Sequence, residues 1–105
     1  MDSMLKNAVR QDRQRVEYMI NSYKSELKEL PKGTISEKHV GSKTYYYLKY
    51  RAGSKVISDY INAEDLPVVM EIVERKKHLK TMIRFLNNEK AMADSILKGR
   101  SRNRR

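Results

Sequence analysis

The sequence contains no cysteine and no tryptophan, and its 105 residues include only four glycines, two prolines and one phenylalanine. Without cysteine, the chain cannot form disulfides, thiolate nucleophiles or cysteine-based zinc sites, which favours a reducing compartment such as the cytoplasm. No segment approaches the roughly 20 apolar residues that a membrane-spanning helix needs. The first residues also lack the basic and apolar regions of a secretory signal. We therefore expect a cytoplasmic protein that does not bind a membrane.

Groups that carry out catalysis or bind metals are also scarce. The only two histidines, His39 and His78, fall in different predicted elements, whereas a zinc site needs at least three converging ligands. Neither the GxxxxGK[ST] nor the GxGxxG phosphate-binding pattern occurs. The acidic pair Glu64-Asp65 fits the first turn of a helix better than a catalytic carboxylate pair. We therefore predict a protein that is not an enzyme and has no metal or cofactor, with both histidines as ordinary surface or hydrogen-bonded residues.

Positive charge is abundant and unevenly distributed. The formal net charge is +10. Residues 32–61 hold six basic side chains and two acids, and residues 98–105 hold five basic side chains and no acid. Residues 1–31 and 62–97 are close to neutral. Because the excess charge is confined to two segments, these segments are the expected sites of contact with a polyanion.

Two long segments have the apolar periodicity of amphipathic helices, residues 3–30 and residues 63–98. The first helix repeats an apolar residue every seven positions, at Val9, Val16, Tyr23 and Leu30. The second does so at Ile72, Leu79, Leu86 and Ala93. We expect the two helices to form an antiparallel pair. Their remaining exposed stripes could also hold two copies together as a homodimer.

The segment between the helices has the composition of a sheet. It is rich in Tyr, Val, Ile and Thr, and Gly41-Ser42 and Gly53-Ser54 divide it as hairpin turns would. This pattern predicts a three-stranded antiparallel meander over residues 34–61, with strands near 34–40, 43–51 and 55–61. The predicted fold class is therefore α+β, with one domain over residues 1–98. The basic tail, residues 99–105, is expected to be disordered until it binds a partner.

Alternation along the middle strand separates its side chains into two sets. Tyr45 and Tyr47 share one face with Lys49 and Arg51, and we expect this face to be exposed. The other set, together with a tyrosine of the last strand, is expected in the core: Tyr46, Leu48, Tyr50 and Tyr60. Exposed tyrosines next to cations suit nucleic acids, because the rings stack on bases and the cations neutralise phosphates. The simpler alternative is that these tyrosines only pack at a half-buried sheet surface.

The predicted binding residues lie in the sheet and in the tail. In the sheet they are Lys43, Tyr45, Tyr47, Lys49, Arg51 and Lys55, and in the tail they are Lys98, Arg100, Arg102, Arg104 and Arg105. Arginine-rich segments commonly become ordered on RNA or DNA, although a solvated terminus without a specific partner is the alternative for the tail. The expected partner is a nucleic acid or a nucleoprotein complex, with RNA, DNA, single strands and duplexes all left open.

The pattern G-x-K-x-Y-Y-Y-L-x-Y-R-x-G-x-K-V-x-x-Y-I, from Gly41 to Ile61, resembles an uncharacterised family of small bacterial and archaeal proteins. That family has a helix, a Tyr-rich hairpin and a long helix. Its last strand often ends in Lys-Tyr-Ile-Gly, where this chain has Asp59-Tyr60-Ile61-Asn62 and so an acid in place of a cation. The hairpin is also similar to the three-stranded arm-binding module of phage-type integrases, which reads DNA with its sheet. These resemblances imply a bacterium, phage, plasmid or other mobile element as the source.

Three functions are consistent with these features. The leading prediction is a nucleic-acid-binding accessory protein of a bacterium or mobile genetic element, which uses the sheet as its contact surface and the tail as an electrostatic anchor. The first alternative is a protein-interaction module, such as an inhibitor of the anti-CRISPR type, that docks on a nucleoprotein complex. The second alternative is a structural homodimer built on the helices.

Overall fold

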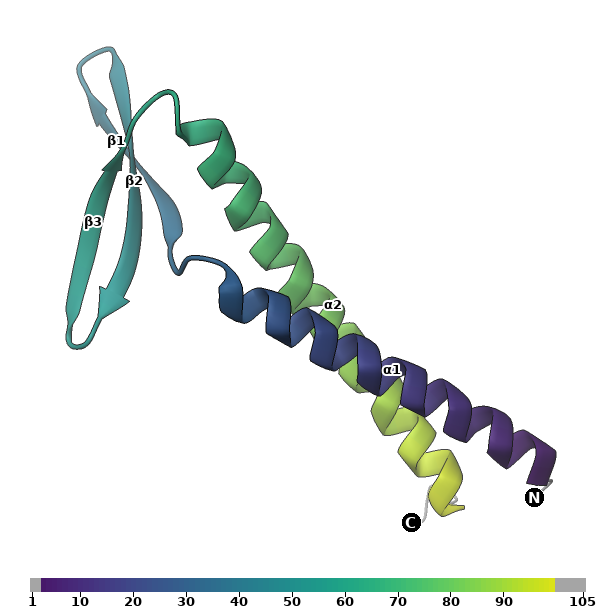
Figure 1. Ribbon diagram of the computed structural model, residues 1–105. Helices are drawn as coiled ribbons and strands as arrows, with labels where there is room; N and C mark the ends of the chain where they lie inside the picture. The colour runs from purple at the N-terminus through teal and green to yellow at the C-terminus, as the bar shows by residue number, and fades with distance from the viewer. Residues whose placement is uncertain (1–2, 100–105) are drawn as a thin grey trace. The chain divides into compact units, whose positions relative to one another are not determined.

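The structure, a computed structural model, describes residues 3–99 of the chain. The elements follow one another as α1 (Ser3–Glu29), β1 (Thr34–Val40), β2 (Lys43–Ala52), β3 (Lys55–Ile61) and α2 (Leu66–Lys98) (Figure 1). The predicted α+β fold, with a long helix on each side of an antiparallel meander, is confirmed. Within residues 3–99, no helix has the length and apolar character needed to span a membrane. The predicted disorder of residues 100–105 concerns a segment outside the described residues.

The element boundaries agree with the predicted ones to within one residue except at the start of α2, which lies at Leu66 but was predicted at residue 63. A turn occupies that position, because the carbonyl of Asn62 accepts hydrogen bonds from the backbone N–H groups of Asp65 and Leu66, both at 3.0 Å. The helix begins only after this turn, and Pro67 lies in its first turn, where a missing N–H does no harm. From there α2 runs without interruption to Lys98.

The chain separates into two compact units. The helical unit comprises residues 1–27 and 79–105, and the sheet unit comprises residues 28–78. The long helix α2 contributes to both units. Our assignment of residues 1–98 to a single domain stays a prediction.

The helical unit is an antiparallel pair of helices with a narrow core. Val16, Ile20 and Leu86 are buried together, and Met19 and Tyr23 pack against them. Leu79 and Ala93 are also buried, as the seven-residue repeat of α2 predicted. Ion pairs fix the relative levels of the helices. Arg13 bonds to Asp94, and Lys90 lies 3.1 Å from Glu17. The hydrogen bond to Asp94 and the nearby negative charge raise the pKa of Arg13 above its ordinary value.

The sheet unit is built on β2, which pairs with both neighbours in the order β1-β2-β3. The first part of α2 lies beside one face of this sheet, because Ile35 and Tyr46 of the sheet line a hollow together with Met70 and Val73 of the helix. A second contact joins the helix to the start of the sheet: the ammonium of Lys76 donates to the carbonyl of Gly33 at 2.9 Å. These contacts cover only one face of the sheet.

Candidate nucleic-acid interface

The strand register decides which side chains share a face of the sheet. In the first hairpin Lys38 pairs with Tyr45, and in the second Tyr60 pairs with Tyr47. Directly paired residues of an antiparallel sheet point to the same side, and side chains alternate along each strand. One face therefore carries seven basic and aromatic residues: Lys38, Lys43, Tyr45, Tyr47, Lys49, Arg51 and Tyr60. We call this the basic face.

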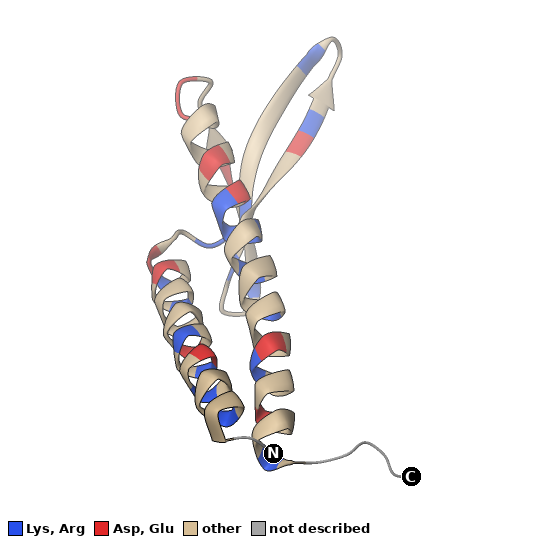
Figure 2. Ribbon diagram, turned by 90° about the vertical axis from the view of Figure 1, so that its right-hand side faces the viewer, with Lys and Arg blue, Asp and Glu red and all other residues tan. Residues whose placement is uncertain are grey.

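The basic face has four cations and no acid. The two acids of the strands, Glu37 and Asp59, pair with Tyr46 and Leu48 respectively and so lie on the opposite face. All four cations of the basic face are exposed. Within residues 3–99, none of these four makes a hydrogen bond or an ion pair. By contrast, several cations of the helices are neutralised by acids on the same or the facing helix. The separation of basic from acidic side chains onto opposite faces is thus a feature of the sheet. Figure 2 shows the basic positions along its strands.

Three tyrosines form an aromatic cluster in the middle of the basic face. The ring centroids of Tyr47 and Tyr60 are 5.8 Å apart in an edge-to-face arrangement, and those of Tyr45 and Tyr60 are 6.3 Å apart and tilted. Tyr60 keeps 56% of its surface exposed. Cations lie on both sides of the cluster along β2, with Lys43 before it and Lys49 and Arg51 after it.

The expected burial of the tyrosines was wrong in two respects. First, Tyr45 and Tyr47 were predicted exposed and Tyr46 and Tyr50 buried, but all four are half-buried. The cause is that both faces of the strand are partly covered, one by the ring of Tyr60 and the other by the start of α2. Second, Tyr60 was predicted in the core with Leu48 or Val56, but it lies exposed on the basic face because it pairs with Tyr47.

The predicted lysines of the sheet also need one correction and one addition. Lys55 pairs with Ala52, which places it on the face opposite Lys49 and Arg51. Although Lys55 was predicted as a binding residue together with Lys49 and Arg51, it therefore does not share their face. Lys38, which was not among the predicted binding residues, lies on the basic face beside Tyr45. The position of Lys38 could have been predicted from the length of the first turn, because a two-residue loop fixes which residues pair on either side of it.

Asp59 does not place negative charge on the basic face, although it replaces a cation of the resembling family. The hydroxyl of Tyr50 donates a hydrogen bond to the Oδ2 atom of Asp59 at 3.0 Å. This bond raises the pKa of the Tyr50 phenol above its ordinary value. The acid is thus held on the opposite face by a cross-strand partner.

Of the predicted tail residues, only Lys98 is described, as an exposed residue at the end of α2. The other four, Arg100, Arg102, Arg104 and Arg105, lie outside the described residues.

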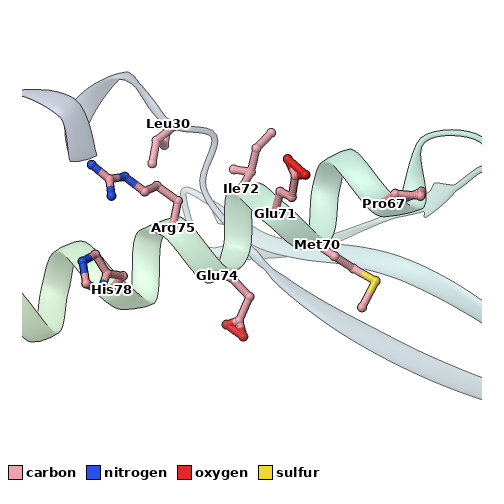
Figure 3. A pocket seen from close by; sticks show the side chains of 8 residues that line it. All are labelled: Leu30, Pro67, Met70, Glu71, Ile72, Glu74, Arg75 and His78. Carbon is pink, nitrogen blue, oxygen red and sulfur yellow. The ribbon is translucent and has the colours of Figure 1, made fainter.

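Outside the basic face, the described residues include an exposed histidine and an open hollow on α2. His39 is exposed, with its Nδ1 atom 3.0 Å from the hydroxyl of Thr44, as expected of a hydrogen-bonded surface residue. An open hollow on α2 is lined mainly by apolar atoms, and Figure 3 shows Leu30 and Ile72 on one side of the helix while Glu74 points away from them. In the part of the chain that the structure describes, no three His, Cys, Asp or Glu side chains gather to hold a metal ion.

Residues 6–71 match the family described as "Domain of unknown function (DUF6788)". Because this match covers more than half of the chain, the protein belongs to the DUF6788 family. It includes most of α1, the whole sheet and the first residues of α2. No curated protein and no solved structure matches the chain.

Proposed function

We propose that this protein binds nucleic acid through the basic face of its sheet and has no catalytic role. The observation that carries the proposal is the segregation of charge: four exposed cations without an acid on one face, and both acids of the strands on the other. If this arrangement served solubility alone, it would not require the acids to be excluded from one face. A face with exposed cations and no acid is, however, what a surface needs to approach a phosphate backbone.

The aromatic cluster supports the same proposal. Tyr60 is the most accessible ring of the three, and base stacking on an aromatic ring contributes about 1–3 kcal/mol per base. The flanking cations extend from Lys43 to Arg51, a distance of roughly 27 Å along an extended strand. In this arrangement the rings contact bases or sugars while Lys43, at one end, and Lys49 and Arg51, at the other, contact phosphates on either side of them. Lys98 and the four arginines of the tail would add further phosphate contacts.

The resemblance to the arm-binding module of phage-type integrases makes duplex DNA one of the ligands to be tested. A small antiparallel sheet fits the major groove of DNA. RNA and single strands complete the set, because the sheet could equally accept splayed bases on its rings. A bacterium or a mobile genetic element remains the proposed source of such an accessory protein.

The test compares two triple variants that each remove three cations. Lys38→Ala, Lys49→Ala and Arg51→Ala change the basic face, whereas Lys24→Ala, Lys80→Ala and Arg84→Ala remove exposed cations from the helices. Fluorescence polarisation with labelled single-stranded and duplex DNA and RNA measures affinity, and thermal melting verifies folding. If each sheet cation contacts one phosphate, the first variant should bind roughly 100-fold more weakly at physiological salt. The second should bind nearly as well as the wild type.

Truncation after Gly99 separates the contribution of the tail from that of the sheet. The truncation removes four arginines and no apolar residue, so we expect weaker binding to every nucleic acid alike and an unchanged melting temperature. If instead the sheet variant stays folded and binds all ligands as the wild type does, the basic face is not a nucleic-acid surface. Docking on a nucleoprotein complex then becomes the better explanation of the charge.

A further inference from the structure

The aromatic cluster of the basic face presents one of its three rings to the solvent. Tyr60 contacts the rings of both Tyr45 and Tyr47, at interplanar angles of 56° and 66° respectively. Those two tyrosines are half-buried, whereas Tyr60 keeps 56% of its surface exposed. Because its two neighbours hold the exposed ring in place, Tyr60 has less side-chain freedom to lose when a ligand stacks on it.

The basic face offers few groups that could read paired bases. In duplex DNA only the base edges are accessible, and Asn or Gln reads adenine, Asp or Glu reads cytosine, and Arg or Lys reads guanine. Among the described residues of the strands, this face carries no Asn, Gln, Asp or Glu. Besides its cations and tyrosines it holds only short side chains: Thr34, Ser36, Val40, Val56 and Ser58. The centre of the face consists of rings, on which a base that is stacked inside a duplex cannot lie.

The relative strengths of charge and stacking determine which form of nucleic acid this face prefers. Each phosphate contact contributes a salt exponent of about 0.9 on B-form DNA and about 0.7 on a single strand. For the four cations of the basic face, charge alone therefore favours a duplex by roughly fivefold at physiological salt. An unpaired base stacked on an aromatic ring strengthens binding by about 5- to 150-fold. Two stacked bases are thus sufficient to reverse the preference that charge alone would give.

We propose that the basic face selects single-stranded nucleic acid, with an unpaired base stacked on Tyr60. This inference rests on the proposed function and adds the form of the ligand to it. The backbone of a single strand is free to turn its bases toward the rings while its phosphates meet Lys43 on one side of the cluster and Lys49 on the other. Aromatic side chains on the surface of a sheet are a common means of binding unpaired bases.

Fluorescence polarisation with labelled oligonucleotides of about 12 nucleotides tests the proposal. The probes are a single strand, the duplex of the same sequence, and an abasic strand with the same number of phosphates. The wild type should bind the single strand at least tenfold more tightly than the abasic strand, and also more tightly than the duplex. Tyr60→Ala should lose most of both preferences, and Tyr60→Phe, which keeps the ring, should restore them. Tyr18→Ala is the matched control, since Tyr18 is 74% exposed on α1, and this variant should keep both preferences.

A second measurement needs no variant. The chain has seven tyrosines and no tryptophan, so its intrinsic emission comes from tyrosine, and the single strand should quench this emission more than the abasic strand does. Thermal melting verifies that each variant is folded.

Equal affinity of the wild type for the single strand and the abasic strand would overturn the proposal, as would tighter binding of the duplex or a folded Tyr60→Ala protein that keeps both preferences. In each of these cases the protein still binds nucleic acid through its cations, so the proposed function stands. A wild type that binds none of the probes would instead overturn the proposed function and this inference with it. Single strands of DNA and RNA are both used, because the rings accept bases of either, and the tighter of the two identifies the sugar that the site prefers.

Discussion

Gly33 occupies a constrained backbone position at the start of the sheet. Its φ is +122°, a conformation that residues with a side chain rarely adopt. A Cβ atom there would lie 2.8 Å from the carbonyl oxygen of Lys49 and 2.9 Å from the Cδ1 atom of Leu48. The glycine therefore allows the chain to pass from α1 into β1 in close contact with β2, at the residue where the basic face has one of its cations.

We predict that Gly33→Ala destabilises the protein by about 2–4 kcal/mol, because backbone strain and a clash with a neighbouring strand act together. Gly53→Ala is the control. Its φ is +66° but no atom lies within 4 Å of the added Cβ, so only the left-handed backbone costs free energy, about 1 kcal/mol. Urea unfolding of both variants measures the difference. Equal losses of unfolding free energy in the two variants would show that the close approach of β2 to Gly33 does not add to the cost of a side chain there.

At the level of elements, the hairpin of β2 and β3 contains a hydrogen bond whose strength depends on pH. The phenol of Tyr50 must be neutral to donate to Asp59, and this bond raises the pKa of Tyr50 above its ordinary value of 10.0. A group whose pKa is higher in the folded state stabilises that state below its unfolded pKa and loses this effect as the pH rises through the folded value.

We therefore predict that Tyr50→Phe lowers the melting temperature at neutral pH and that the difference from the wild type disappears as the pH rises beyond about 10. Melting curves of the two proteins over this pH range provide the measurement, and the other six tyrosines titrate in both and cancel. A difference that persists at the alkaline end would mean that the phenol stabilises the hairpin by packing alone.

The sequence was sufficient to predict the elements but not the composition of the sheet faces. Strand boundaries followed from Gly41-Ser42 and Gly53-Ser54, since a two-residue turn ends one strand and starts the next. The same turns determine the pairs Lys38–Tyr45 and Tyr47–Tyr60. Alternation within one strand does not by itself show which face of the next strand joins it, and Tyr60 and Lys55 were therefore predicted on the wrong faces. The half-burial of Tyr46 could not be predicted in this way, because it depends on α2.

At the scale of the whole molecule, sequence periodicity predicted both helices but not the division of the chain into two units. The boundary falls at residue 78 within the continuous helix α2, where no glycine or proline marks it. The apolar repeat predicted the buried residues Val16, Leu79, Leu86 and Ala93.

The two units differ in whether their cations have acidic partners. In the helical unit, cations meet acids across the helix pair and contribute to its register. In the sheet unit, the four cations of the basic face have no such partners within residues 3–99. The proposed function depends on this contrast, since only charge that is free of internal partners can release counterions when it meets a phosphate backbone.

The salt dependence of binding therefore tests the central claim most directly. If about five to seven cations contact phosphates, log K should fall with log salt concentration with a slope near −4 to −6 for the wild type. The Lys38, Lys49 and Arg51 triple variant should have a slope shallower by about three, while the Lys24, Lys80 and Arg84 variant should keep the slope of the wild type. An affinity that does not change with salt, or equal slopes for the two variants, would contradict a nucleic-acid surface on the basic face.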